Sequence, residues 1–406
     1  MSNGGPAEHR ASYPDGPKDR CFYTERENMY VDLQESRKQI DEIDSKIVEL
    51  FEKRMTVAGN VADYKIATGK PVFDKEREES KIKTLTDITK DSFNKKCVAE
   101  LFSQIMAMSR KLQYGKLESS SENSRLEPYE VIDAIPTDNV RVVYQGIPGA
   151  YSHEAMIDFF GKSVDSINVD TFRDAMEAVN AGKADYAVIP IDNSSAGMVS
   201  DTYDLLQEYN NYIVAETFLE VKHCLLVKPG ADIDSIQKVY SHPQALMQCA
   251  RYLDGHRKWQ REPFLNTAMS ARKVAEENDY TQAAIASPNC AGEYGLEIAE
   301  EGINSSSANT TRFVIVSSRR AFVKSAGKVS ICFEIAHRAG SLYNALSNIM
   351  FNGLNMTKIE SRPIAEHNWE FRFFVDFEGN LSDAGVRNAL RGICEEANKF
   401  KLLGNY

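Results

Sequence analysis

The sequence predicts a multidomain protein with an all-helical segment, then an α/β segment, then a small α+β segment. Apolar residues first recur at helical spacing, and from Val140 apolar strand-like runs alternate with helical runs. From Lys328 the pattern reads strand, helix, strand, strand, helix, strand. A chain of 406 residues is also too long for one hydrophobic core, so two or three domains are expected.

The composition narrows the class of protein. Hydrophobic residues make up 42% of the chain and charged residues 26%, which is ordinary for a soluble globular protein. The net charge of -11 argues against general nucleic-acid binding, although a local cluster of Arg and Lys can still bind an anion. No long apolar run predicts a membrane span, and no apolar stretch near Met1 predicts a secretory signal. We therefore expect a cytoplasmic protein.

Neither a metal nor a cofactor is predicted. The seven cysteines are scattered without a C-x-x-C pair, which argues against a zinc ribbon or a disulfide framework. His153 and His242 lack ligand spacing with any Cys or carboxylate pair, so structural roles are expected for both. The stretch 146–149 is not a G-x-G-x-x-G and predicts no dinucleotide. Residues 1–27 are rich in Gly, Pro and charge and are expected to be disordered.

Residues 28–115 form the predicted helical segment. Asp32 and Glu35 fit a capping box that opens a helix, and apolar residues continue at helical spacing until Gly69 and Pro71 end it. A second helix is expected to begin near Asp74, a plausible N-cap. A third is expected from about Lys96 to Tyr114, with Gly115 as its C-cap.

Three cations on the first helix could bind an anion. Arg54 and Lys65 are eleven residues apart, so they face the same way about 16 Å apart along the axis. Arg37 lies about 26 Å from Arg54 and cannot reach the same ligand within one straight helix. If all three serve one site, Arg37 must come from a second copy of the chain. The alternative is that these are solvated charges on an amphipathic helix.

Residues 116–139 lack apolar periodicity and are interpreted as a linker, and residues 140–318 form the α/β segment. Three of its predicted strands are followed at once by small or polar residues, and ligands bind at the carboxyl ends of strands in open α/β sheets. These loops are 146–152, 190–197 and 241–244. Ordinary turn chemistry is the alternative for each.

Thr311, Arg312 and Phe313 lie where a polar loop meets an apolar strand. Arg312 can hold a carboxylate through two hydrogen bonds, and Thr311 can donate a proton or hydrogen bond to the neighbouring group. A surface Arg at the start of a strand is the alternative on these residues alone.

Residues 33–114 resemble the all-helical chorismate mutase family at eight polar positions. These are Arg37, Arg54, Lys65, Asp74, Arg77, Glu78, Ser109 and Gln113. The resemblance implies an intertwined helical dimer that rearranges chorismate to prephenate. It also implies that Arg37, Arg54 and Arg77 grip two carboxylates. Lys65 and Gln113 would face the breaking ether, and Asp74 and Glu78 would orient the ring hydroxyl.

Residues 140–318 resemble prephenate dehydratase in the three loops and in Thr311-Arg312-Phe313, which occur in family order. The resemblance implies two α/β lobes, like a periplasmic binding protein, with a cleft in which prephenate becomes phenylpyruvate. Thr311 would then donate to the departing hydroxyl and Arg312 would hold a carboxylate, while Asn193, Ser241 and Gln248 complete the pocket. Asp192 departs from the family, which more often has Glu there, and its carboxylate is one methylene nearer the backbone.

Residues 326–406 suggest a ferredoxin-like sandwich and resemble the phenylalanine-binding ACT domain of dehydratases. The resemblance rests on two motifs, Gly340-Ser341-Leu342 and Glu360-Ser361-Arg362-Pro363. The family usually has Pro-Gly-Ala-Leu at the first, so Ala339 and Ser341 differ. A purely structural dimerisation module is the alternative for this segment.

The three segments together predict a bifunctional chorismate mutase–prephenate dehydratase of phenylalanine biosynthesis with phenylalanine as effector. No cofactor, nucleic acid or membrane partner is expected, and the chain should form a homodimer or a higher homo-oligomer. The competing interpretation is a non-catalytic two-lobed aromatic-acid sensor fused to a helical dimerisation module. Such a sensor needs Arg312 but no donor aimed at a leaving group.

Overall fold

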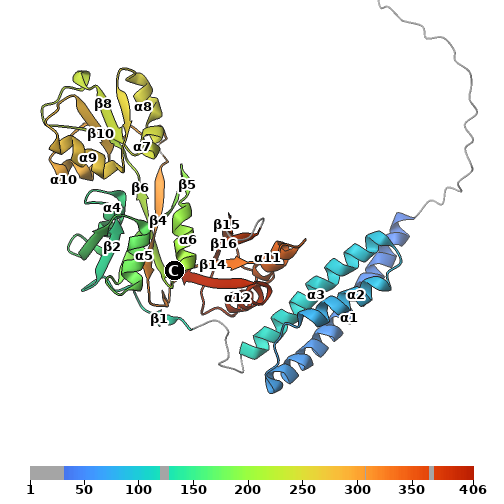
Figure 1. Ribbon diagram of the computed structural model, residues 1–406. Helices are drawn as coiled ribbons and strands as arrows, with labels where there is room; N and C mark the ends of the chain where they lie inside the picture. Colours follow the sequence, from blue (N-terminus) through green and yellow to red (C-terminus); the bar gives the residue numbers. More distant parts are fainter. Residues whose placement is uncertain (1–31, 119–127, 307, 365–369) are drawn as a thin grey trace, which may run out of the picture. The chain divides into compact units, whose positions relative to one another are not determined.

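The computed structural model describes residues 32–118, 128–306, 308–364 and 370–406. The expected disorder of residues 1–27 therefore falls outside the described residues, as does much of the predicted linker. The contacts within the chain divide it into two compact units. The first ends at Thr56, within the first helix, and the second begins at Val57. Each unit is described by itself. Figure 1 gives the labels of the helices and strands.

Three helices form the N-terminal part: α1 (Leu33–Thr68), α2 (Lys75–Asp87) and α3 (Ser92–Glu118). Asp32 accepts a hydrogen bond from the backbone N–H of Gln34 at 2.8 Å, as expected of a capping residue. Asp74 is the predicted N-cap of α2 and accepts from the N–H of Arg77 at 3.1 Å. Both helix starts are thus confirmed.

The end predicted for the third helix is wrong, because α3 continues through Gly115 to Glu118. Lys116, one residue past that glycine, donates to the carbonyl of Gly59 at 3.1 Å and pairs with Asp63 at 2.9 Å. A helical glycine costs only about 1 kcal/mol relative to alanine, so contacts beyond it can keep the helix going.

The α/β segment has two lobes (Figure 1). The strands of the first lobe belong to a larger sheet than those of the second lobe. Parallel strands β3, β2 and β4 continue through the antiparallel strands β12 and β6. Buried apolar residues cover both faces of this sheet. Its elements are β2 (Arg141–Gln145), α4 (Tyr151–Phe160), β3 (Asp165–Val169), α5 (Phe172–Asn180), β4 (Tyr186–Asn193), β5 (Gly197–Met198), α6 (Ser200–Glu208), β6 (Tyr212–Glu220) and β12 (Thr310–Ser317).

The second lobe is built on a five-stranded sheet in the order β11-β7-β10-β8-β9. The chain enters it between β6 and β7 and returns between β11 and β12. Its elements are β7 (Cys224–Val227), η1 (Ile233–Ser235), β8 (Lys238–Ser241), α7 (Pro243–Gln248), α8 (Ala250–Gly255), β9 (Gln260–Pro263), α9 (Thr267–Glu276), β10 (Gln282–Ala286), α10 (Asn289–Tyr294) and β11 (Glu297–Glu300).

Part of the predicted linker is structured. Strand β1 (Glu130–Ile132) pairs in parallel with β13 (Ala321–Val323), which follows the α/β segment. The hydroxyl of Tyr129 donates to the carbonyl of Leu402 at 3.0 Å. The interpretation of these residues as a free tether is therefore wrong, because their backbone is hydrogen-bonded to the C-terminal half of the chain.

The C-terminal segment has the predicted βαββαβ order. Its antiparallel strands lie in the order β15-β16-β14-β17, with buried apolar residues beneath α11 and α12. Strand β17 also meets β6, with Gly404 opposite Ile213, so the dehydratase-like sheet and the C-terminal sheet are one ten-stranded sheet. The elements are β14 (Lys328–Glu334), α11 (Ser341–Phe351), β15 (Met356–Pro363), β16 (Phe371–Glu378), α12 (Ala384–Glu396) and β17 (Lys399–Asn405).

Candidate functional site

A cleft of about 300 Å³ is lined by residues of both lobes of the α/β segment. Three of the five residues predicted to form the dehydratase pocket line it: Asn193, Gln248 and Thr311. The loop after β2 contributes Gly146 and Ala150. Polar residues that the sequence interpretation missed are His223, Asn266 and Thr267, whereas Gln244 comes from the predicted loop 241–244. The predicted position of the site at strand ends is thus supported, with more residues than the motifs indicated.

Thr311 lies within strand β12, not in the loop before it, and is 8% exposed. It lies opposite Asn193 on β4, whose side-chain amide donates to Thr311 Oγ1 at 2.9 Å. The orientation of that amide is fixed, because Asn193 Oδ1 accepts from the backbone N–H groups of Ser195 and Ala196 at 3.0 and 2.8 Å. Since the Thr311 oxygen already accepts this bond, its own proton is available to a group in the cleft.

A chain of hydrogen bonds leads from Asn193 into the second lobe. Ser195 Oγ donates to Asn193 Oδ1 at 2.7 Å and accepts from Gln248 Nε2 at 2.8 Å. Gln248 Oε1 lies 2.9 Å from His223 Nε2, and the other ring nitrogen lies 2.9 Å from the hydroxyl of Tyr151. The two lobes therefore share one polar network whose end is the Thr311 hydroxyl.

His223 was not found from the sequence, because one histidine between two strands has no motif. Its ring is buried, and burial lowers its pKa while the hydrogen bond with Gln248 opposes that effect. The only indication of a functional role is its position, because His223 lies where the chain passes from β6 to β7, beside the cleft. The neutral ring can donate to Gln248 and accept from Tyr151 at the same time.

Ser241 is placed outside the cleft. It is fully buried, and its hydroxyl donates to the carbonyl of Ile285 at 2.6 Å on the neighbouring strand β10. Its hydrogen-bonding is satisfied within the sheet of the second lobe, so the predicted substrate contact is not supported. The next residue, His242, lines the cleft and caps α7 by accepting from the N–H of Gln244 at 3.2 Å. His153 likewise accepts from the N–H of Gly149 at 3.2 Å, so both histidines have the structural contacts expected of them.

Arg312 points away from the cleft, which corrects the expectation that it holds a substrate carboxylate there. Successive side chains of a strand face opposite sides, so Thr311 and Phe313 line the cleft and Arg312 does not. Its guanidinium donates to Glu216 at 2.7 Å, to Asp376 at 2.9 Å and to Asp192 at 3.3 Å. Burial opposes the charge on Arg312, but Tyr406 and these acidic neighbours raise its pKa overall.

Asp192 is the neighbour of Asn193 and faces the same side as Arg312. It accepts from Lys358 of β15 and from the hydroxyl of Tyr203 at 3.3 Å. Asp192 therefore belongs to the charged groups around Arg312 and does not line the cleft. The shorter carboxylate is held close to the strand by partners on three sides.

Six predicted mutase residues lie on α2 with its N-cap, on α3 and at the adjoining end of α1: Lys65, Asp74, Arg77, Glu78, Ser109 and Gln113. Lys65 donates to the carbonyl of Val72 at 2.5 Å, and burial lowers its pKa against the opposing effect of Asp74 and Glu78. Glu78 pairs with Arg110, a residue that was not predicted. Ser109 and Gln113 are both buried on one face of α3, and Gln113 Oε1 has no hydrogen-bond partner among the described residues. The side-chain oxygen of Gln113 is therefore a buried acceptor inside the helical part that a ligand could use.

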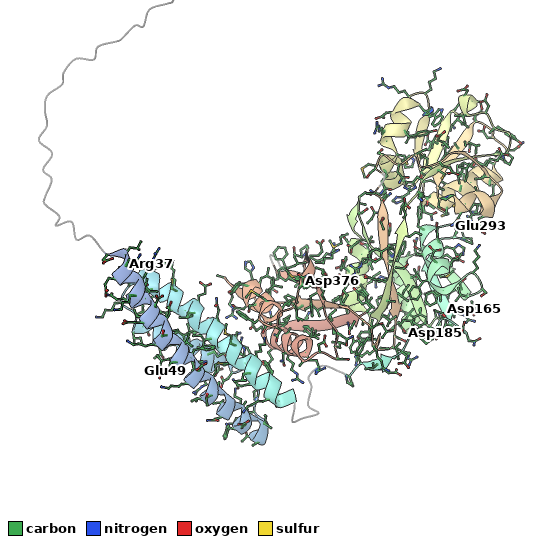
Figure 2. The ribbon with its side chains drawn as sticks, turned by 180° about the vertical axis from the view of Figure 1, so that it is seen from behind. Arg37, Glu49, Asp165, Asp185, Glu293 and Asp376 are labelled. Carbon is green, nitrogen blue, oxygen red and sulfur yellow. The ribbon has the colours of Figure 1, made fainter. Side chains whose placement is uncertain are left out.

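The other two predicted mutase residues are Arg37 and Arg54. Arg37 and Arg54 belong to the other compact unit, on α1, and Figure 2 labels Arg37 near the start of that helix. Arg77 lies in the first turn of α2, where its N–H completes the Asp74 cap.

The predicted effector motifs lie on α11 and β15. Gly340 is the N-cap of α11 with φ +83°, a left-handed conformation that favours glycine. Ser341 and Leu342 begin the helix, and the second motif, Glu360 to Pro363, ends strand β15. Arg362 is paired with Asp204 of α6, so this residue contacts the first lobe of the α/β segment.

Two further features concern metals and membranes. Across residues 32–118 and the other described ranges, no group of three His, Cys, Asp or Glu side chains is arranged to hold a metal ion. Among the helices of the same ranges, none combines the length and the apolar character that crossing a bilayer requires.

Comparisons with known proteins agree with this architecture. The chorismate mutase type II family matches residues 36–114, and the prephenate dehydratase family matches residues 142–321. The bifunctional chorismate mutase/prephenate dehydratase of Enterobacter agglomerans is 31% identical over 376 residues, which cover 91% of this chain and 94% of that protein. The enzyme of the same description from Neisseria gonorrhoeae is 33% identical over 372 residues, with 91% and 95% covered.

A solved structure resembles about two thirds of the chain. It is the prephenate dehydratase of Arthrobacter aurescens in complex with L-Phe, with a TM-score of 0.62 and 29% sequence identity. The match covers 66% of this chain and 89% of that protein.

The buried state of His223 predicts a pH-dependent stability. Its folded pKa is below the ordinary value of 6.5, so the unfolded chain binds more protons and the free energy of unfolding falls as pH drops through about 6.5. One proton contributes a slope of at most about 1.4 kcal/mol per pH unit. Urea unfolding between pH 5 and 7.5, followed by tryptophan fluorescence, should show a shallower slope for His223→Gln. The exposed His337→Gln is the control. Equal slopes for His223→Gln and the unaltered chain would contradict the prediction.

Proposed function

The chain belongs to the bifunctional chorismate mutase/prephenate dehydratase family, and we propose here which residues carry out its two reactions and how it is regulated. It is both a chorismate mutase and a prephenate dehydratase, so chorismate and prephenate are its substrates. The assignments of residues to roles are ours. They rest on the contacts of the cleft, of the helical part and of the C-terminal segment.

Prephenate dehydration requires a donor for a departing hydroxyl. The carbon–carbon bond to the ring carboxylate breaks, its electron pair enters the ring, and the carbon–oxygen bond opposite breaks, giving carbon dioxide, hydroxide and phenylpyruvate. Aromatisation drives the step, so the enzyme must mainly stabilise the negative charge on the leaving oxygen. In our proposal Thr311 donates a hydrogen bond to this oxygen. The observation that carries the proposal is the Asn193 amide, which occupies the Thr311 oxygen and leaves its proton for the cleft.

The other polar residues of the cleft hold this donor. Gln248 and His223 connect the Asn193 turn to the second lobe through Ser195. A donor fixed before the reaction stabilises developing charge better than one that must reorient. We therefore assign Asn193 a positioning role toward Thr311, and Gln248 a positioning role toward the turn that contains Asn193.

The mutase reaction needs cations that hold two carboxylates and donors near the ether oxygen. Lys65, Asp74, Glu78, Ser109 and Gln113 are proposed to line one part of that site, and Arg54 lies on the same face of α1 as Lys65. Arg37 is proposed to come from a second copy of the chain. Support comes from the apolar face of α1, where Ile40, Ile43 and Ile47 are each 54% exposed and Leu50 is 64% exposed. Burying such side chains against a partner contributes about 1.5–3 kcal/mol each.

We propose that residues 326–406 are a ferredoxin-like ACT domain that binds phenylalanine. The βαββαβ order and the left-handed Gly340 at the start of α11 support this assignment, because a helix N-terminus attracts a carboxylate. The Arthrobacter aurescens prephenate dehydratase was solved with L-Phe, which supports phenylalanine as the effector. The proposed boundaries of the other domains are 28–115 for the mutase and 140–318 for the dehydratase.

Thr311→Ala should lower the dehydratase kcat by about 100-fold or more, since removing one donor to a developing oxyanion typically costs 10²–10³. Mutase activity should stay intact, because the helical part does not contain Thr311. Conversion of prephenate to phenylpyruvate and of chorismate to prephenate would be measured on the same preparation. Equal loss of both activities would argue against separate sites, and an unchanged dehydratase kcat would refute the proposed role of Thr311 as the donor.

Arg37→Ala and Lys65→Ala chains should each be nearly inactive as mutases and regain activity when mixed. A mixed dimer has one site without either substitution if each site takes Arg37 from one copy and Lys65 from the other. Subunit exchange would be verified with differently tagged chains. Absence of recovery in proven mixed dimers would count against a shared site.

Phenylalanine should lower the production of phenylpyruvate from prephenate in the unaltered chain. Gly340→Val should weaken this inhibition at least tenfold, because a β-branched residue cannot readily adopt φ +83° at the N-cap. Gly292→Val is the matched control, since that glycine has open space around it. Inhibition that is unaffected by Gly340→Val would exclude this helix start as the phenylalanine site.

A further inference from the structure

Arg312 is the centre of a buried charged layer behind the catalytic strand. Its side chain is 10% exposed and bonds Glu216 of β6, Asp192 of β4 and Asp376 of β16. Its Nη2 also donates to the hydroxyl of Tyr406 at 2.6 Å. Figure 2 labels Asp376 on the C-terminal strands. The guanidinium is thus held from three strands and from the last residue.

The surrounding charges balance. Lys328 pairs with Glu216 at 2.5 Å, and Lys358 pairs with Asp192. Together with Arg312 these give three cations against the three carboxylates of Asp192, Glu216 and Asp376. Ser330 adds a hydrogen bond to Asp376 at 2.5 Å and lies 2.6 Å from the Tyr406 hydroxyl. A buried ion network of this kind is costly to break, because removing one partner leaves an uncompensated buried charge.

The layer coincides with an irregularity in the sheet. Thr311 lies opposite Asn193 and Arg312 opposite Asp192, but Phe313 lies opposite Pro190. Ile191 is therefore the extra residue of a β-bulge on β4. Bulges beside active sites re-aim neighbouring side chains. Here the bulge directly follows the Arg312–Asp192 pair, which is next to the pair that carries the 2.9 Å hydrogen bond from Asn193 to Thr311.

The ion pair between Arg312 and Asp192 joins the two strands at this bulge. Asp376 and Tyr406 hold the same guanidinium from the C-terminal segment. We propose that Arg312 is a positioning residue, clamped by Asp192, Glu216 and Asp376, which fixes the bulged strands and thereby the direction of the Thr311 hydroxyl. Two of its partners, Asp376 and Tyr406, make the C-terminal segment part of the dehydratase site. The inference rests on the proposed role of Thr311 and deepens it.

This role differs from substrate binding in a measurable way. A residue that grips the substrate carboxylate in both ground state and transition state mainly affects KM when changed. A residue that aims Thr311 affects kcat, because Thr311 acts on the departing oxygen only as the bond breaks. Arg312→Lys keeps the positive charge but loses the planar guanidinium group, whose N–H donors can bond several carboxylates at once.

The test is steady-state dehydratase kinetics of Arg312→Lys, Asp376→Asn and Tyr406→Phe in the full chain. We expect Arg312→Lys to lower kcat at least tenfold with KM for prephenate within about threefold. Asp376→Asn and Tyr406→Phe should lower kcat by about three- to tenfold, again with little change in KM. Arg319→Lys is the matched control, because Arg319 pairs with Glu130 on the surface, where the two side chains are 60% and 58% exposed.

A double variant separates a clamp from independent effects. Arg312→Lys with Asp376→Asn should be no slower than Arg312→Lys alone within about twofold, because both changes break the same contact. The proposal would be overturned if the loss of kcat in the double variant equalled the product of the losses in the two single variants. A tenfold higher KM with an unchanged kcat would overturn it as well.

The measurements distinguish three outcomes: a variant that does not fold, a wrong role for Thr311, and a wrong positioning role for Arg312. Mutase activity and thermal unfolding on the same samples report folding. If Arg312→Lys does not fold, a kcat within twofold of the unaltered chain for both Asp376→Asn and Tyr406→Phe still overturns the clamp. If Thr311→Ala retains full dehydratase activity, the proposed role of Thr311 fails instead.

Discussion

The alternation of side chains along β12 is the constraint on which the dehydratase half depends. One strand presents Thr311 and Phe313 to the cleft and Arg312 to the charged layer behind it. Thr311, the proposed donor, and Arg312, which contacts the C-terminal segment, are therefore neighbours in the sequence but lie on opposite faces of one sheet. Any displacement of this strand moves both.

The cleft is organised by backbone donors more than by charge. Asn193 is held by two N–H groups of its own turn, and it in turn holds Thr311. Amide and hydroxyl groups fixed in this way supply direction without the desolvation cost of a buried ion. The charges of the region gather instead around Arg312, where they connect strands of the dehydratase lobe with the C-terminal strands.

Much of this architecture was predictable from sequence, because local patterns determine it. Helical spacing and the caps at Asp32 and Asp74 located the helices, and apolar runs located the strands. Thr311, Asn193 and Gln248 were assigned to the pocket by their resemblance to prephenate dehydratase, and the strand-end rule indicated only the loops near them.

The site predictions that were wrong or missing depended on the direction of a side chain or on partners far away in the sequence. Arg312 and Ser241 were assigned to the pocket by their positions in motifs, yet each faces partners on another strand. His223 was missed because its partners, Tyr151 and Gln248, are far from it in sequence. Periodicity gives the face of a strand only when the register is known, and the bulge at Ile191 shifts that register.

The two crossings of the chain between the lobes have a mechanical consequence. Residues 221–223 form one crossing, and the other leads directly into Thr310. Rotation about these two hinges would separate Gln248 from Ser195, since those side chains come from different lobes. The network around Thr311 therefore depends on the relative position of the two lobes, and a change in the angle between them would reach the Thr311 hydroxyl through Gln248, Ser195 and Asn193.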